Sequence, residues 1–292
     1  MPTLLLFGGT GRSGCVLARA ARERGWSVTT PAHADCPLED AARVSDLVLQ
    51  ARADLVINAA AVSGLETCAD DALRAHLINA VAPAAMALAC RHTGSRFIHL
   101  STDYVLDGRK PGLKDETYHC KPLSVYGESK REGELQVLEA LPQALIARVS
   151  WICGNPQKPA FVEQTLTKAL EGMPLAAIAD KDCLPTDAED IARALLALAA
   201  TGERGVLHLT SCGPPSSWRD CAVLALEEAV RVGALAAAPP VEAQQLKNAV
   251  FFREPRPQHT AMDNGRLLSL GISMPTGAQT VAAVTRRWLS AR

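Results

Sequence analysis

Two side chains with complementary proton chemistry, Tyr126 and Lys130, lie four residues apart in the sequence. On a helix this spacing places both side chains on one face, one turn apart. A phenol has an ordinary pKa of about 10, and a neighbouring ammonium group lowers that pKa by favouring the phenolate. Such a pair can pass a proton to or from a substrate oxygen. The hydroxyl of Thr102, which follows the apolar run 96–100, could hold the same oxygen. The predicted catalytic residues are therefore Thr102, Tyr126 and Lys130.

A glycine-rich turn near the start of the chain predicts where a cofactor would bind. The apolar run 3–7 indicates a buried strand, and the segment 8–14 (Gly-Gly-Thr-Gly-Arg-Ser-Gly) follows it directly. A helical pattern and a second strand at 26–30 come next, which is the context of a nucleotide-binding site. Small residues let the backbone approach a pyrophosphate, and the helix start offers free N–H groups. The predicted cofactor contacts in this turn are Gly8, Thr10, Gly11, Arg12, Ser13 and Gly14.

The end of the second strand predicts which nicotinamide cofactor is preferred. An NAD-specific site usually places an acid there, which binds the ribose hydroxyls and repels a 2′-phosphate. In this chain no acid follows that strand before Asp35, and Arg12 lies close by in the glycine turn. We therefore expect a modest preference for NADPH over NADH, with Arg12 near the extra phosphate and Asp35 as a further cofactor-binding candidate.

The remaining pattern predicts the elements that position these residues. Further strands are expected at 54–58, 96–100 and 144–149, and they alternate with helices. This alternation favours an α/β fold with a Rossmann-type, doubly wound parallel sheet. A long helix is expected over 69–92, with a kink or break at Pro83. Because such sheets bind ligands at the carboxyl ends of their strands, five more residues become cofactor-binding candidates: Asn58, Ala59, Ala60, Ala61 and Ser101.

Beyond residue 150 the alternation weakens, which predicts a second and smaller domain. Residues 1–150 are expected to form the NAD(P)-binding domain and residues 151–292 mainly a substrate-binding domain. Part of the segment 187–210 is expected to return to the first domain. Helices are predicted at 160–171, 187–201, 217–231 and 277–290.

Composition argues against several other classes of protein. Hydrophobic residues make up 48% of the 292 residues and charged residues 21%, which is typical of a globular chain. The net charge is −1, and no basic block suggests a nucleic-acid partner. We expect no membrane span, because no apolar run reaches about 18 residues, and no signal peptide. The nine cysteines show no C-x-x-C spacing, which predicts reduced thiols in the cytoplasm and no metal site.

Several motifs together resemble those of a known family. They are the glycine turn 8–14, Val-Ile-Asn-Ala-Ala-Ala at 56–61, Ser-Thr-Asp-Tyr-Val-Leu-Asp-Gly at 101–108, Tyr-Gly-Glu-Ser-Lys at 126–130 and Arg-Pro-Gln-His at 256–259. Over nearly its whole length the chain resembles the extended short-chain dehydrogenase/reductases, and most closely the dTDP-4-dehydrorhamnose reductases. The resemblance implies reduction of a 4-keto nucleotide sugar by a nicotinamide cofactor, whose ribose Lys130 would bind beside Tyr126.

A substrate of this kind carries a diphosphate, which needs cations. Lys181 and Arg256, in the second half of the chain, are the basic residues that we expect to bind it. The full set of predicted substrate contacts is Thr102, Asp103, Tyr104, Val105, Trp151, Lys181 and Arg256.

The chain departs from the family pattern at positions that bear on the substrate. The string 180–186 carries Lys181 and Cys183 where the family usually has glutamine and glycine, and Leu106 replaces an aromatic residue. Three other functions therefore stay open: reduction of a different carbonyl compound, epimerisation or dehydration with bound NAD, and a non-catalytic NADP-binding regulatory subunit. Net consumption of NADPH would indicate a reductase. A homodimer is a further expectation.

Overall fold

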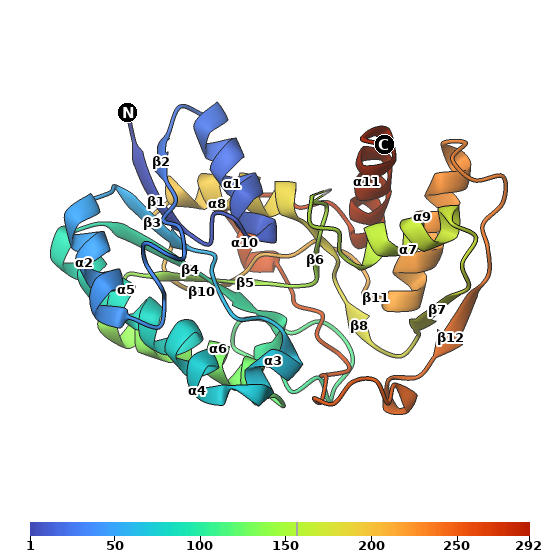
Figure 1. Ribbon diagram of the computed structural model, residues 1–292, viewed down its shortest axis with the longest axis horizontal. Helices are drawn as coiled ribbons and strands as arrows, with labels where there is room; N and C mark the ends of the chain where they lie inside the picture. The colour runs from blue at the N-terminus through green and yellow to red at the C-terminus, as the bar shows by residue number, and fades with distance from the viewer. Residues whose placement is uncertain (156) are drawn as a thin grey trace.

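A six-stranded parallel sheet forms the centre of the computed structural model, which describes residues 1–155 and 157–292 (Figure 1). The strand order is β10-β5-β4-β3-β1-β2, and every neighbouring pair is parallel. In chain order the strands are β1 (Thr3–Phe7), β2 (Ser27–Thr29), β3 (Leu55–Asn58), β4 (Arg96–Thr102), β5 (Leu145–Val149) and β10 (Gly205–His208). The predicted α/β fold with a parallel sheet is confirmed.

Helices cover both faces of this sheet (Figure 1). One face carries α1 (Arg12–Glu23) and α8 (Ala188–Ala199), and the other carries α2 (Ala41–Ala51), α5 (Ala82–Thr93) and α6 (Val125–Ala140). Alternate side chains of β1 point to opposite faces of the sheet. Leu4 and Leu6 pack with α1 and α8, whereas Leu5 and Phe7 pack with α2 and α5. The continuous apolar run at 3–7 is explained by this burial on both sides.

The single helix that we expected over 69–92 is a run of shorter pieces. These are α3 (Leu65–Asp70), α4 (Ala72–His76), the π-helical turn η1 (Leu77–Val81) and then α5. The N–H of Ala82 donates to the carbonyl of Leu77, five residues back, as in a π turn. Pro83 lies in the first turn of α5 and has no N–H to donate to the preceding turn. The break is therefore a π turn that ends just before the proline.

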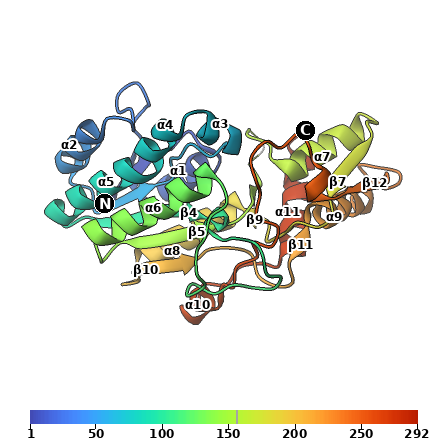
Figure 2. The same cartoon turned by 90° about the horizontal axis from the view of Figure 1, so that it is seen from below.

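A second group of elements lies beside the sheet at one end of the molecule (Figures 1 and 2). Three helices, α7 (Phe161–Leu170), α9 (Trp218–Arg231) and α11 (Gly277–Ser290), share an apolar core next to the parallel pair β7 (Leu175–Ile178) and β12 (Val241–Gln244). The predicted helices of this half are observed as α7, α8, α9 and α11. The short elements are β6 (Ile152–Cys153), β8 (Asp182–Cys183), β9 (Thr186–Asp187), β11 (Ser216–Ser217), η2 (Asp103–Val105), η3 (Leu246–Asn248) and α10 (Gly265–Ser269).

The chain returns from this group to the sheet. After β9 it forms α8, which packs on α1, and β10, which pairs with β5 at the sheet edge. The division into a cofactor domain and a substrate domain near residue 150 stays a prediction.

One helical stretch, Ala72–Thr93, is long and apolar enough to cross a membrane by length and composition. However, 56% of its apolar window is buried inside the protein, and α5 packs between α2 and α6. A core helix of a soluble protein passes the same test, so this stretch is weak evidence for a membrane span.

Candidate active site

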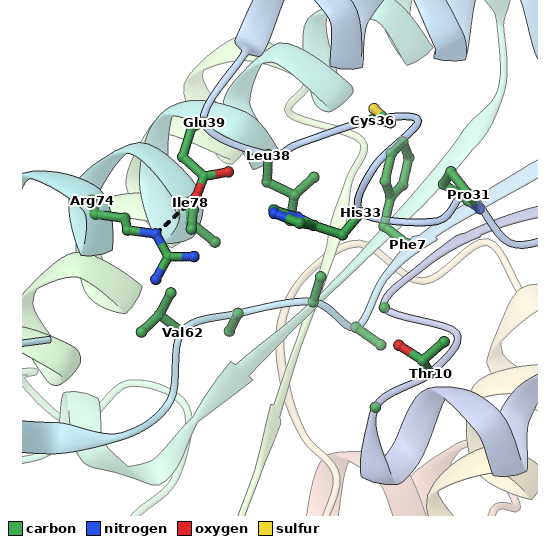
Figure 3. A pocket seen from close by; sticks show the side chains of 15 residues that line it. Phe7, Thr10, Pro31, His33, Cys36, Leu38, Glu39, Val62, Arg74 and Ile78 are labelled. Atoms are coloured by element: carbon green, nitrogen blue, oxygen red, sulfur yellow. Dashed lines mark hydrogen bonds and ion pairs between the residues drawn. The ribbon is translucent and has the colours of Figure 1, made fainter. Parts of the chain in front are cut away.

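A cavity of about 280 Å³ opens at the carboxyl ends of β1 and β3, next to the loop that follows β2 (Figure 3). The strand order reverses here: the chain passes from β1 to β2 on one side, and then through α2 to β3 on the other. Such a switch point is where open α/β sheets bind their ligands. The lining of this first cavity includes six predicted cofactor contacts: Gly8, Thr10, Gly11, Ala59, Ala60 and Ala61.

The glycine turn packs so tightly against the end of β3 that a side chain would collide with it. Gly8 has φ of +80°, and a Cβ added there would lie 2.6 Å from the nitrogen of Ala60. A Cβ on Gly14 would lie 2.0 Å from the oxygen of Gly8. Helix α1 starts directly after the turn, and its N-cap residue Gly11 has no side chain to cap it. The first-turn N–H groups, including that of Ser13, therefore favour an anion such as a pyrophosphate.

The outer part of the first cavity contains two residues that the sequence alone did not single out, Leu38 and Arg74. Figure 3 shows the side chains of His33, Leu38 and Arg74 around the same space. The Nε of Arg74 donates to Oε1 of Glu39 at 2.8 Å, so an acid stands beside this cation. Asp35 instead lies in the turn after β2, outside the cavity lining. The loop 30–40 has no periodic pattern, so only its fold reveals which of its residues face inward.

A second cavity, of about 250 Å³, lies at the carboxyl ends of β4 and β5 and faces the second group of elements. It brings together residues from both halves of the chain. The predicted site residues that line it are Arg12, Thr102, Asp103, Tyr104, Tyr126, Trp151 and Lys181, of which Arg12 was expected at the cofactor. The structure adds Ser63, Leu65, Val149, Ile152, Cys183 and Trp218 to this lining.

The three predicted catalytic residues are positioned by β4 and α6. Thr102 ends β4, and Tyr126 lies in the first turn of α6, which the hydroxyl of Ser124 caps by accepting from the N–H of Gly127 at 3.3 Å. Lys130 lies one turn further along and is buried against β4, where its Nζ donates to the carbonyl of Leu100 at 2.7 Å. The spacing predicted from the sequence is thus present on one helix.

The acidities of the two α6 residues differ from the sequence-based expectation. Burial raises the pKa of the Tyr126 phenol, and the hydrogen bond with Thr102 acts in the opposite direction. Burial lowers the pKa of Lys130 to about 8, against a small rise caused by Glu134. Because burial dominates, the lowering of the Tyr126 pKa that we expected from Lys130 is not observed. The phenol is a protonated acid in this state.

A buried pair of opposite charges forms the floor of the second cavity. Asp103 accepts a hydrogen bond from Ser150 at 2.9 Å, and burial raises the pKa of its carboxyl, while Lys181 lowers it. Burial lowers the pKa of Lys181, while Asp103 raises it. The Nζ of Lys181 donates to the carbonyl of Pro257 and lies 5.1 Å from the ring centroid of Tyr104.

Arg12 and Trp218 both line the second cavity. The Nε of Arg12 donates to the carbonyl of Lys158 at 3.0 Å, which directs the side chain away from the first cavity. The predicted contact of Arg12 with a 2′-phosphate does not agree with this position. Trp218 stacks on Trp151 with ring centroids 5.5 Å apart, and its indole N–H is buried without a partner within the described residues.

Three predicted contacts have other neighbours in the structure. Val105 is fully buried in a core cluster behind the cavity. Arg256 forms an ion pair with Glu66 at 3.0 Å and lines neither cavity. The hydroxyl of Ser101 donates to the carboxylate of Glu134 at 2.6 Å. Ligand roles for these residues stay predictions, and each would require a rearrangement that frees the side chain.

Among residues 1–155 and 157–292, no group of three His, Cys, Asp or Glu side chains is arranged to hold a metal ion. All nine cysteines are free thiols.

Comparisons with known proteins agree with this geometry. A family model described as the RmlD substrate binding domain matches residues 2–289. The probable dTDP-4,6-dihydroxy-2-methyloxan-3-one 4-ketoreductase of Streptomyces antibioticus is 30% identical over 272 residues, which cover 92% of this chain and 89% of that protein. The dTDP-4-dehydrorhamnose reductase of Escherichia coli K12 is 34% identical over 238 residues, 79% of each chain.

A solved structure of dTDP-4-dehydrorhamnose reductase from Bacillus anthracis, in complex with NADP, superposes with a TM-score of 0.88. The match covers 98% of this chain and 99% of that one at 22% identity, which supports the fold. The chain therefore belongs to the RmlD substrate binding domain family and is an oxidoreductase of the short-chain dehydrogenase/reductase type.

Proposed function

We propose that the protein is an NADPH-dependent reductase of a keto group on a nucleotide-linked sugar. One observation carries this proposal: the hydroxyl-bearing residues Thr102 and Tyr126 line a cavity that shares the glycine turn with the first cavity. Thr10 and Gly11 line the first cavity, and Arg12, the next residue, lines the second. A dinucleotide that follows the turn would therefore extend from the switch point of the sheet to the catalytic phenol.

The residues of the first cavity suit the adenosine and pyrophosphate parts of NADP. Gly8 and Gly11 present backbone without side chains to the cavity, and the start of α1 supplies N–H donors for the pyrophosphate. His33 and Arg74 are the basic residues of this cavity, and Glu39 opposes them, which agrees with a modest preference for NADPH and weaker use of NADH. NADP bound to the Bacillus anthracis reductase supports the same assignment. When bound, the reduced cofactor supplies a hydride to the carbonyl carbon.

The chain's own residues would supply the proton and hold the substrate. Tyr126 donates its phenolic proton to the carbonyl oxygen, and its raised pKa keeps that proton available at neutral pH. Thr102 positions the same oxygen from the end of β4. Lys181 supplies a buried cation on the substrate side, and Trp151 and Trp218 supply stacked rings.

The relatives support a dTDP-sugar as the substrate, but they do not agree on which one. Those named above are a dTDP-4-dehydrorhamnose reductase and a 4-ketoreductase of a different dTDP-sugar. The cavity also contains Cys183 beside Lys181, where the family pattern differs from this chain. A keto-sugar other than dTDP-4-dehydrorhamnose is thus the second candidate substrate for the same site.

The test is a panel of 4-keto nucleotide sugars assayed with NADPH and with NADH. We expect at least one dTDP-linked sugar to give stoichiometric oxidation of NADPH. The Tyr126→Phe variant should lose about 10²- to 10⁴-fold in kcat, because general acid catalysis contributes that much, with unchanged affinity for NADPH. Tyr118→Phe is the matched control, since Tyr118 bonds to Asp107 at 3.1 Å outside both cavities. Near-normal turnover by Tyr126→Phe would show that the assignment is mistaken.

We also propose that the enzyme acts in the cytoplasm, because nine free thiols are typical of a reducing compartment. A homodimer stays a prediction, which sedimentation would test.

A further inference from the structure

A buried line of hydrogen-bonding groups connects the backbone of the cofactor site to Lys130. The N–H of Ala60 donates to Oδ1 of Asn58 at 3.0 Å. The Nδ2 of Asn58 lies 3.1 Å from Nδ1 of His99, and Nε2 of His99 lies 3.1 Å from Nζ of Lys130. The exposed fractions of Asn58, His99 and Lys130 are 0%, 0% and 2%, so water does not enter between them.

The backbone N–H at one end gives this line a fixed direction. It can only donate, so it holds Oδ1 of Asn58 as the acceptor and turns the amide NH₂ of Asn58 toward His99. An amide nitrogen also only donates, so Nδ1 of His99 must present its lone pair. A neutral imidazole with a lone pair on Nδ1 carries its proton on Nε2, and that proton faces Nζ of Lys130.

An ammonium group has no lone pair, whereas a neutral amine has one and keeps two N–H donors. The contact between His99 and Lys130 is therefore a hydrogen bond only when Nζ is neutral. The neutral amine still donates to the carbonyl of Leu100. If Nζ gains a proton, the imidazole proton must move to Nδ1, where it meets the NH₂ of Asn58. At least one hydrogen bond of the line is then lost.

Among the charged and titratable groups around Lys130, Glu134 favours the ammonium form, but burial acts more strongly in the opposite direction. From β4 there is His99, and burial and then Lys130 itself hold its pKa well below the usual range, so it stays neutral. From α6 there are Tyr126 and Glu134, and the carboxylate of Glu134 is paired with Arg148 on β5 at 2.7 Å. Burial already lowers the pKa of Lys130 to about 8, and the hydrogen-bond direction acts in the same sense.

We propose that Asn58 and His99 are positioning residues that bias Lys130 toward the neutral amine in the free enzyme. In that state no ammonium charge on Lys130 favours the phenolate of Tyr126. The phenol therefore stays protonated and can donate its proton in the reductive direction. The consequence for catalysis rests on the proposed function, but the hydrogen-bond direction is a property of the free protein. Both tests below therefore use the free protein, without substrate. Their failure would refute the hydrogen-bond direction, whereas failure of the reductase assay would refute the proposed function.

The first test is the tautomer of His99, read from ¹⁵N chemical shifts of the imidazole nitrogens. The chain has seven histidines, and loss of one signal set in His99→Gln identifies His99. We expect a proton on Nε2, a lone pair on Nδ1, and a ring that stays neutral below the ordinary histidine pKa. A proton on Nδ1, or an imidazolium at neutral pH, would overturn the proposal. The tautomer is read in the native protein, and His99→Gln serves only to assign the signals.

The second test is the titration of Lys130, followed through ¹³Cε-labelled lysine in the native protein and in two variants. Asn58→Asp keeps the shape but replaces the donor by an acceptor, so the imidazole proton can move to Nδ1 and Nε2 can accept from the ammonium. His99→Gln adds no charge but offers Lys130 an amide oxygen. A hydrogen bond gained by the protonated form raises the pKa of Lys130 by about one unit or more.

The two variants separate hydrogen-bond direction from simple charge. A rise of the Lys130 pKa by at least about half a unit in both variants would support the proposal. A rise of the Lys130 pKa in Asn58→Asp alone would mean that the added carboxylate acts only through its charge. No rise in either variant would mean that Asn58 and His99 do not influence Lys130. Either result would refute the proposal. Asn248→Asp, at an exposed site on η3, is the control for net charge and should leave the pKa of Lys130 unchanged.

Discussion

The close packing of the glycine turn on β3 can be measured with a pair of matched substitutions. Gly8 and Gly25 have the same φ of +80°, but a Cβ on Gly8 would lie 2.6 Å from the nitrogen of Ala60, whereas a Cβ on Gly25 meets nothing within 4 Å. Alanine at either position adopts a left-handed backbone at a cost of about 1–2 kcal/mol. Only Gly8→Ala adds a steric overlap, which costs a further ~1–3 kcal/mol.

We therefore expect Gly25→Ala to lower the free energy of unfolding by about 1–2 kcal/mol and Gly8→Ala by about 2–5 kcal/mol. To reach an ordinary contact of about 3.4 Å, the backbone at Ala60 must retreat, and this backbone is the wall of the first cavity. Affinity for NADPH should thus fall at least about tenfold in Gly8→Ala, a loss of about 1.4 kcal/mol, and stay unchanged in Gly25→Ala.

Urea unfolding gives the free energies, provided that the m-value stays constant, and quenching of tryptophan fluorescence gives the affinity. Equal destabilisation by the two substitutions, together with native NADPH affinity in Gly8→Ala, would refute the argument from the Gly8–Ala60 contact.

Three further predictions concern the second cavity and the surface. Arg12→Ala should raise the KM for the substrate and leave the ratio of kcat/KM with NADPH and NADH unchanged, because Arg12 lines the second cavity, where we propose that the substrate binds; a changed ratio would restore its role at the 2′-phosphate. Trp218→Phe keeps the stacked ring but removes the indole N–H, which has no partner within the described part of the chain and could donate to the substrate. Steady-state kinetics should therefore show a KM about 2–10-fold higher at constant kcat. Hydrogen bonds from Arg231 and Arg286 lower the pKa of Glu228 to about 2. Because its folded-state pKa lies below the ordinary value, the stabilisation is complete above about pH 4.5 and is lost as the pH falls through 2. Glu228→Gln should cost about 1 kcal/mol at pH 7, since the arginines are partly exposed, and nothing once the pH is well below 2.

The parts of the site that depend on short stretches of chain were predictable from the sequence. The strand, glycine turn and helix at the N-terminus, and the placement of Tyr126 and Lys130 on one helix face, follow from local periodicity and spacing. The return of part of the segment 187–210 to the first part of the chain was also expected, and α8 and β10 lie against α1 and β5.

The rest depends on contacts between segments that are far apart in the sequence. The ion pair of Arg256 with Glu66 joins residues 190 positions apart, and no local pattern reveals that it occupies the expected phosphate ligand. The acidity of Tyr126 followed burial, which the sequence does not report, and not the neighbouring lysine. Trp218 was recognised only as a helix start, because its stacking on Trp151 is visible only in three dimensions.

The late addition of β10 to the sheet has a consequence for the integrity of the first 150 residues. All five residues of β5 are buried, and β10 covers its outer edge through parallel pairing along the whole of β10. A fragment that stopped at residue 150 would leave this apolar strand with a free row of N–H and C=O groups, the arrangement that recruits foreign strands and causes aggregation. The same fragment would lack α8, whose apolar face shields α1. We therefore expect the first 150 residues not to fold as a separate soluble module, because the edge of the sheet beside β5 is covered only when residues 205–208 have been added.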